Sequence, residues 1–521
     1  MTKINSQISK IYKNSIYIYG NTAFSMLVSL ISTRLILNAL GSSDFGIFCI
    51  VGGAIGMLGF INGSMAGATQ RFINYAEGAG QETEKRRIVN ASIFIHFCIS
   101  FVALIAFEIA YYFFFNGILN IPHDRIYAAK IIYQFTVIST LLTIQTTPYN
   151  ALINAHEDLK YYSIIGCIFT FIKLLIAIII VVTSHDKLIL YGFFTTITSL
   201  LNIIIVRIYC HKKYTECIFS PKKYLDSHTI KKMFSFASCT LLTTVTSMIS
   251  TYGGNIVINK FFGTSINAAQ GVSSQISGQL MVFSNNMLMA VNPVIGKKAG
   301  AKDYHSMIKY AITSSKLSYL ILLFFAVPFI IEADWIMTFW LKNVPDWAVI
   351  FLRFEIARKL LEQLIIGIKN AVVAEGNIKQ LSRVQSIIYL LPLPITYILF
   401  YYGFQPVWLY ITWILCLNII AGYNIITQAR KHCNLDIRVY FNSLIYKCLS
   451  VSIIIIIFGY IPHVLLQQSF VRIIIVTLTV STAYIIMTWN ISLSNEEKNI
   501  IKNIILTTQT KIKGIYKNHR F

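Results

Sequence analysis

The sequence of 521 residues has few charged side chains, and carboxylates are the scarcer kind. Only 12% of the residues are charged, whereas soluble proteins average about a quarter. A soluble chain of this length would form several domains, and their surfaces would need far more charge. The low charge therefore excludes a set of ordinary soluble domains.

Sequence signatures of catalysis and metal binding are also missing. The nine cysteines form no CxxC pair, and Cys210, His211 and Cys217 share a loop with a spacing that fits no usual zinc pattern. The glycines of 52–67 follow no strand and precede no Lys-Ser pair, so they favour close helix packing over a phosphate-binding loop. We therefore expect no enzyme activity, no metal and no cofactor.

Apolar residues, by contrast, make up 55% of the chain and come in long blocks. A block of about 20 such residues can cross a hydrocarbon layer about 30 Å thick as a helix. The sequence therefore predicts an all-α, polytopic membrane protein with about 14 transmembrane helices. The blocks cover roughly residues 16–40, 45–67, 91–115, 128–150, 163–182, 188–208, 234–258, 268–292, 313–333, 347–368, 386–402, 407–428, 447–462 and 467–489.

Lysine and arginine collect on one side of these blocks. When the connections are numbered alternately from the N-terminus, inside segments hold 33 of the 44 basic residues and outer ends hold about five. This is the positive-inside distribution, and it places both termini in the cytoplasm. A net charge of +23 is also typical of nucleic-acid-binding proteins. Such proteins present one basic face, whereas here the basic residues are spread over many connections, so no nucleic-acid binding is expected.

The two halves of the chain resemble each other. Residues 29–34 read like 247–252, and further short matches follow in the same order as far as Ala79-Gly80 and Ala299-Gly300. The copies lie six spans apart, so both have the same orientation in the membrane. That is the arrangement of parallel repeats about an axis along the membrane normal.

The repeat predicts how the chain is divided. Two six-helix lobes would enclose a central cavity, and two extra helices would follow the second lobe. The last segment would be an amphipathic helix on the inner surface, and it opens with the capping box Ser494-x-x-Glu497. The expected parts are an N-lobe at 1–210, a basic cytoplasmic linker at 211–233, a C-lobe at 234–430, helices 13 and 14 at 447–489, and a basic tail at 490–521.

Several ionisable side chains fall within the apolar blocks, where each costs about 2.5–3.5 kcal/mol and usually faces a cavity or a partner. Arg34, Lys173 and Arg358 would give a substrate cavity a cationic lining. Such a lining suits a pyrophosphate or an acidic sugar, because charge-assisted hydrogen bonds are strong. Glu108 in the third block is a candidate to carry a coupling proton.

The tenth block is the most charged. Helical spacing places Glu355, Arg358, Lys359 and Glu362 on one face. One interpretation assigns this face to the substrate cavity, with Glu355 as a second candidate for a coupling proton. The alternative is that Arg358 and Lys359 only neutralise the two carboxylates at i+3 or i+4 spacing.

Five short segments between the spans carry a family resemblance: 40–46, 68–72, 151–157, 267–271 and Asn292-Pro293. They resemble bacterial polysaccharide flippases of the Wzx type, in the multidrug/oligosaccharidyl-lipid/polysaccharide exporter (MOP) superfamily. The resemblance covers nearly the whole chain and is clearest over residues 15–300. It implies a MATE-like fold of fourteen helices, with two lobes around a central cavity that has cationic lumen residues.

The resemblance also implies a function. The protein would move an undecaprenyl-pyrophosphate-linked oligosaccharide from the cytoplasmic to the periplasmic leaflet of the bacterial inner membrane by alternating access. The product would serve surface polysaccharides such as capsule or the O-antigen of lipopolysaccharide. Membrane lipids, a polymerase or ligase for the glycan, and H⁺ or Na⁺ as coupling ion would be its partners.

Two alternative functions stay open at this point. A cation-coupled multidrug exporter of the same superfamily should favour acidic residues in its interior, whereas this interior leans positive. A membrane-embedded polysaccharide polymerase should show a large periplasmic loop or a catalytic acid pair, and no outside loop here exceeds about 14 residues.

Overall fold

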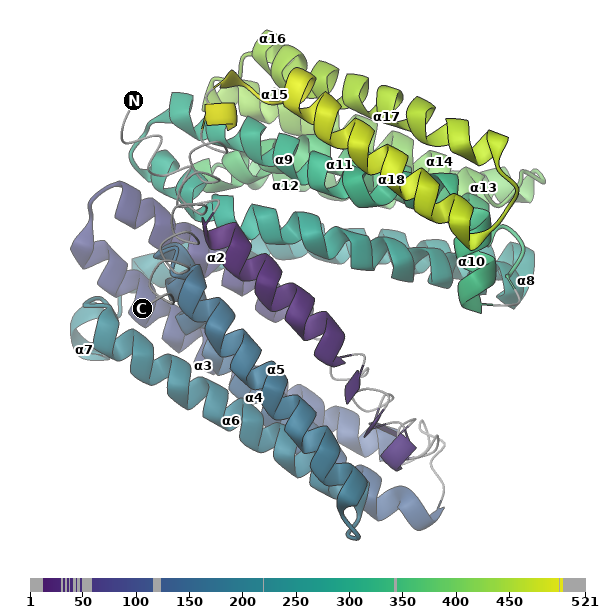
Figure 1. Ribbon diagram of the computed structural model, residues 1–521. Coiled ribbons are helices and arrows are strands. Elements are labelled where there is room, and N and C mark those ends of the chain that lie inside the picture. Colours follow the sequence, from purple (N-terminus) through teal and green to yellow (C-terminus); the bar gives the residue numbers. More distant parts are fainter. Residues whose placement is uncertain are drawn as a thin grey trace, which may run out of the picture. The chain divides into compact units, whose positions relative to one another are not determined.

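The computed structural model confirms an all-α, polytopic fold (Figure 1). The part of the chain that it describes contains helices and connections but no strand. It describes residues 13–499 except 30, 33–34, 37, 41–43, 45–46, 49–58, 116–122, 219, 342–343, 496.

The described residues divide into two compact units. The first, here called the N-unit, comprises Ile16–Val245 and Gly296–Asp303. The second, the C-unit, comprises the described residues within Met1–Ser15, Thr246–Ile295 and Tyr304–Phe521. Within each unit, long helices run side by side (Figure 1).

The N-unit is built from long apolar helices with short connections. Their order follows the predicted blocks from the second to the seventh. The elements are α2 (Gly59–Gly78), α3 (Glu82–Phe113), η2 (His123–Arg125), α4 (Ile126–Ala155), α5 (Leu159–Val182), α6 (Lys187–Lys213), α7 (Pro221–Tyr224) and the first part of α8 (Ser227–Gly300).

The core of the N-unit lies where α4 packs against α3, α5 and α6. Ile132 and Tyr133 of α4 are fully buried there, and the Tyr133 hydroxyl donates a 2.7 Å hydrogen bond to the Phe107 carbonyl. Gly192 of α6 faces Ile132 so closely that an added Cβ would lie 3.2 Å from it. A small residue on one helix and branched residues on the other let these helices approach, as in other membrane bundles.

The C-unit contains Thr246–Ile295 of α8 and a longer series of helices. Three of its elements are π-helical, a feature often found at functional sites. The elements are α9 (Tyr304–Ile331), α10 (Ala333–Leu341), α11 (Ala348–Glu375), α12 (Lys379–Leu390), α13 (Pro392–Tyr401), α14 (Trp408–Trp413), η3 (Ile414–Ile420), α15 (Ala421–Cys433), α16 (Ile437–Tyr440), η4 (Phe441–Ile445), α17 (Tyr446–Leu465), α18 (Phe470–Met487) and η5 (Thr488–Ser492).

The 74-residue helix α8 is broken at Gly263, where φ is 79° and ψ is −173°. Glycine adopts a positive φ at little cost because it has no Cβ. The break falls between the seventh and eighth predicted blocks, 234–258 and 268–292. Two predicted spans therefore follow each other with almost no loop.

Among the described residues, ten helices are long and apolar enough to cross a membrane. Each overlaps one predicted block. The second predicted block overlaps α2, the eighth overlaps the later part of α8, and the tenth overlaps α11. These three segments are not among the ten membrane-crossing helices. The chain is thus a multi-pass membrane protein, while the lobe and tail boundaries expected from the repeat stay predictions.

The prediction of close packing at the glycines of α2 is wrong for Gly63 and Gly67. Among the described residues, nothing lies within 4 Å of a Cβ added at either position. Close approach occurs instead at the end of the same helix, where a Cβ on Gly78 would lie 1.8 Å from the Lys297 carbonyl oxygen. A Cβ on Gly300 would lie 1.9 Å from the Tyr75 carbonyl oxygen.

Candidate functional site

The charged face of α11 forms two ion pairs within the helix. Arg358 binds Glu355 in a bidentate manner, with Nε donating to Oε2 at 2.9 Å and Nη2 donating to Oε1 at 2.5 Å. Lys359 donates to Glu362 at 3.1 Å. Both pairs have i,i+3 spacing, so the face carries two positive and two negative charges that balance each other.

The Glu355–Arg358 pair is enclosed by α14 and η3. The Arg358 guanidinium lies 5.5 Å from the ring centroid of Trp413, within the range of a cation–π interaction. Asn418 of the π-helix η3 donates a 3.1 Å hydrogen bond to the Arg358 carbonyl. Glu355 is 3% exposed, so the pair stands in surroundings of low polarity, where charges interact strongly.

Three polar atoms around this pair have no hydrogen-bond partner among the described residues. They are the Tyr410 hydroxyl, Trp413 Nε1 and Asn418 Oδ1, and all three side chains are buried. Buried polar groups of folded proteins are nearly always paired, so a group of exceptions commonly marks a functional position. The group combines donors and an acceptor beside a charge pair, and it could hold a polar ligand group or bound water.

The other predicted site residues lie in the N-unit or outside the described residues. Lys173 is exposed near the middle of α5, and it forms no ion pair with any carboxylate that the structure describes. Glu108 is exposed near the end of α3, and its carboxylate lies 3.5 Å from the amide of Gln134. Arg34 lies outside the described residues.

The N-unit also contains an ionic network that the sequence did not reveal. Lys297 in the last turn of α8 lies 2.7 Å from Glu157 and 3.1 Å from Glu77. His156 forms a 2.5 Å hydrogen bond with Glu216 and stacks on Tyr214 with ring centroids 4.3 Å apart. The segment 151–157 stands out in the sequence only as a family signature, because most of its partners lie far away along the chain.

The loop carboxylate Glu216 has a pKa below its usual value. Burial by itself raises the pKa, but the hydrogen bond with His156, a backbone hydrogen bond and the charges of His156 and Lys85 together outweigh burial and lower it. The carboxylate is therefore ionised near neutral pH, as the network requires. Its side chain is 4% exposed, so it depends on this partner.

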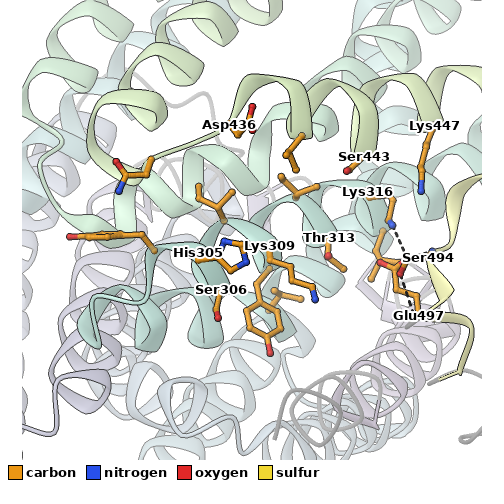
Figure 2. A pocket seen from close by; sticks show the side chains of 18 of the residues that line it. His305, Ser306, Lys309, Thr313, Lys316, Asp436, Ser443, Lys447, Ser494 and Glu497 are labelled. Atoms are coloured by element: carbon orange, nitrogen blue, oxygen red, sulfur yellow. Dashed lines mark hydrogen bonds and ion pairs between the residues drawn. The ribbon is translucent and has the colours of Figure 1, made fainter. Parts of the chain in front are cut away.

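A cavity of about 580 Å³ lies elsewhere in the C-unit (Figure 2). Its wall includes the buried Lys316, whose Nζ lies 2.7 Å from the Glu497 carboxylate and 3.2 Å from the Ser492 carbonyl. The Glu497 carboxylate also accepts a 2.8 Å hydrogen bond from the backbone N–H of Ser494, and the Glu497 N–H donates in return to the Ser494 hydroxyl at 3.3 Å. These reciprocal bonds confirm the predicted capping box.

The sequence did not assign Lys316 to a site. It is the fourth residue of the ninth predicted block, so it lies close to one end of that span rather than at membrane depth. Its partner Glu497 is 181 residues away along the chain. The single sequence signal for this cavity was the capping box, which fixes where Glu497 points.

A family model described as "Polysaccharide biosynthesis protein" matches residues 11–298, more than half of the chain. The chain belongs to this family. A second model, described as "MatE", matches residues 238–398. A search of curated protein sequences gives no match.

Solved structures similar to this member of the polysaccharide biosynthesis protein family are transporters. The Vibrio cholerae MATE transporter VcmN in its bent form has 18% identity, covers 83% of this chain and 98% of its own, and gives a TM-score of 0.67. A MOP superfamily transporter from Pyrococcus furiosus has 14% identity, with coverage of 82% and 95% and a TM-score of 0.68. An outward-facing multidrug resistance MATE family transporter has 13% identity, with coverage of 82% and 95% and a TM-score of 0.69.

At these identities the likeness shows the MATE-like fold, while the family match shows the class of protein. Together they make this polysaccharide biosynthesis family member a membrane transporter of the MOP superfamily and not an enzyme. The alternative of a membrane-embedded polymerase is therefore wrong.

Proposed function

We propose that the protein is a flippase for an undecaprenyl-pyrophosphate-linked oligosaccharide, working by alternating access in the bacterial inner membrane with both termini in the cytoplasm. The lipid tail can stay in the bilayer while the polar head needs a shielded path, because hydrocarbon offers it no hydrogen bonds. The glycan would serve a surface polysaccharide such as capsule or O-antigen.

One observation carries the choice of an anionic substrate. Both carboxylates on the charged face of α11 are already paired with a cation, whereas Lys173 on α5 has no carboxylate partner among the described residues. A binding path with this charge balance suits a pyrophosphate better than a cationic drug. The Pyrococcus furiosus transporter is described as having a binding pocket of reverse polarity that suggests a different function, and we extend that interpretation to this chain.

The Glu355–Arg358 pair offers a way to couple transport to protons. A pyrophosphate that competes for Arg358 would take over the bidentate contact that Glu355 now makes. The released carboxylate of Glu355 would then carry the coupling proton. Loss of that proton would restore the pair and expel the anion, with Arg34 and Lys173 as further contacts along the path.

The test is transport by the purified full-length protein in vesicles. One set of vesicles carries a fluorescent lipid-linked oligosaccharide and the other a fluorescent organic cation. We expect the glycan carrier to change leaflet and the cation to stay outside. Transport of the cation alone would contradict the proposal and establish the multidrug exporter.

A further inference from the structure

A seam of polar side chains runs between the first helix of the chain and α5, both within the N-unit. The first helix covers residues 13–29. Ser25 on this helix and Thr170 on α5 share a 3.0 Å hydrogen bond between their hydroxyls. The Cys167 thiol of α5 donates to Asn21 Oδ1 at 3.3 Å. The proposed flippase mechanism makes no use of these four residues.

A glycine on α5 makes room for the Asn21 amide. A Cβ added at Gly166 would lie 2.8 Å from Asn21 Nδ2 and 2.9 Å from Asn21 Oδ1. Glycine is a poor residue for a helix interior, so the space that the amide needs gives a reason for its presence here. The Ser25 hydroxyl also lies 3.4 Å from Asn21 Oδ1. The amide is therefore held in a fixed position between the two helices.

Two buried hydroxyls at the ends of this seam have no hydrogen-bond partner among the described residues. Ser163 precedes Gly166 by one turn of α5 and is 4% exposed. Ser32 follows Ser25 by two turns, where the first helix continues at 31–32, and is 7% exposed. Residues three, four or seven apart share a helix face, so both hydroxyls lie on the faces that form the seam. Unpaired buried hydroxyls are rare in folded proteins and indicate a bound polar group.

The polar face of α5 is opposite to its apolar exposed face. Ile168 and Leu175 are exposed, and at about 100° per residue they lie about 140–160° from Thr170 and Lys173. Lys173 is exposed too, and it pairs with no carboxylate that the structure describes. A cation at membrane depth faces water or a polar partner and not acyl chains. The space beside the seam is therefore polar, while the other side of α5 suits lipid.

We propose that this seam recognises the sugar unit that is joined directly to the pyrophosphate, an inference that rests on the proposed flippase function. Sugar hydroxyls both donate and accept hydrogen bonds, and the Ser25 and Thr170 hydroxyls and the Asn21 amide offer both. Thr170 precedes Lys173 by one turn, about 4.5 Å along the helix, so a sugar at the hydroxyls lies next to a phosphate at the amine. The seam residues before Lys173 carry no charge, which suits an uncharged sugar.

The experiment measures how tightly the purified full-length protein in lipid nanodiscs binds two probes. One is undecaprenyl pyrophosphate, and the other is the same carrier with one N-acetylglucosamine. The unmodified protein should bind the sugar-bearing probe about tenfold more tightly, since about two hydrogen bonds are gained. A variant with Ser25→Ala and Thr170→Val should lower this ratio to about one. Lys173→Gln should weaken both probes together and keep the ratio, because its amine contacts the pyrophosphate.

A matched control removes a hydroxyl pair elsewhere in the N-unit. Ser139 on α4 and Ser199 on α6 share a 2.6 Å hydrogen bond. The variant Ser139→Ala with Ser199→Ala should therefore keep the tenfold ratio. If the seam variant does not fold, Thr170→Val alone keeps the shape of the side chain and should lower the ratio about threefold, because about one hydrogen bond is lost.

The outcomes separate the sugar site from the proposed function. Equal binding of both probes by the unmodified protein, or an unchanged ratio in the seam variant, would overturn the sugar site and leave the flippase proposal standing. An equal loss of the ratio in the control variant would also overturn the sugar site, because helix packing in general would then explain the loss. Binding of neither probe by the unmodified protein would overturn both proposals.

Discussion

At the scale of single residues, substitutions of Glu355 and Arg358 can separate two roles for this pair, which are binding of the substrate and simple neutralisation of each other's charge. Both ends of the bidentate contact lie in α11, and the pair is shielded by Trp413. A buried charge that loses its partner is costly, whereas removing both charges together can be nearly neutral. Stability and transport should therefore respond differently to single and double substitutions.

We predict that Arg358→Gln lowers the free energy of unfolding by about 3–5 kcal/mol, because Glu355 stays buried without a cation. The double variant Glu355→Gln with Arg358→Gln should recover most of that stability but not transport. Thermal unfolding in detergent and transport in vesicles measure the two effects. Full transport by the double variant would show that the pair only neutralises itself.

A second prediction concerns acid. The pKa of Glu216 is lowered in the folded protein, so its contribution to stability is present above the unfolded pKa and is lost as pH falls through the folded pKa. Glu216→Gln should therefore be less stable than the unmodified protein at pH 7, with the difference shrinking below about pH 4. Unfolding temperatures measured from pH 7 to pH 3 check this, and a constant difference would contradict it.

At the scale of helices, the sequence located most of the elements. Each of the ten described helices that are long and apolar enough to cross a membrane overlaps a predicted apolar block. The gap between the seventh and eighth blocks coincides with the break of α8 at Gly263. Helix spacing also placed Glu355 and Arg358 on one face. These features depend on local composition and on 3.6-residue periodicity, which a single sequence carries.

Local composition and helical periodicity could not predict which distant elements contact each other. Gly63 and Gly67 have the spacing of a packing motif, but the close backbone contacts involve Gly78 and Gly300. Spacing tells which residues share a helix face and not which helix lies against it. The partnership of Lys316 with a residue 181 positions away was hidden for the same reason.

We predict that Gly78→Ala destabilises the protein by about 1–3 kcal/mol or more, because the new Cβ would lie 1.8 Å from a backbone oxygen. Gly63→Ala is the matched control on the same helix. It should leave stability unchanged or raise it by up to about 1 kcal/mol, since alanine favours helix more than glycine. Equal unfolding temperatures for the two variants would contradict the packing described at the end of α2.

At the scale of the whole molecule, the MATE-like fold and the match to the polysaccharide biosynthesis protein family identify a membrane transporter. They do not give the charge of the substrate that it moves. The three residues proposed to contact the pyrophosphate are spread along the chain, in the first, fifth and tenth predicted blocks. Removing all three keeps the helices but takes away the positive lining. On the proposed path only Lys359 then remains to attract an anionic head, and it is already paired with Glu362.

The most direct measurement is the rate at which vesicles containing the purified protein move a lipid-linked oligosaccharide between leaflets. It compares the unmodified protein with a variant carrying Arg34→Ala, Lys173→Ala and Arg358→Ala, after equal folding and insertion have been verified. We expect at least about a hundredfold slower transport by the variant, since each lost charge-assisted contact contributes about 1.5–3 kcal/mol. Transport at the unmodified rate would contradict it.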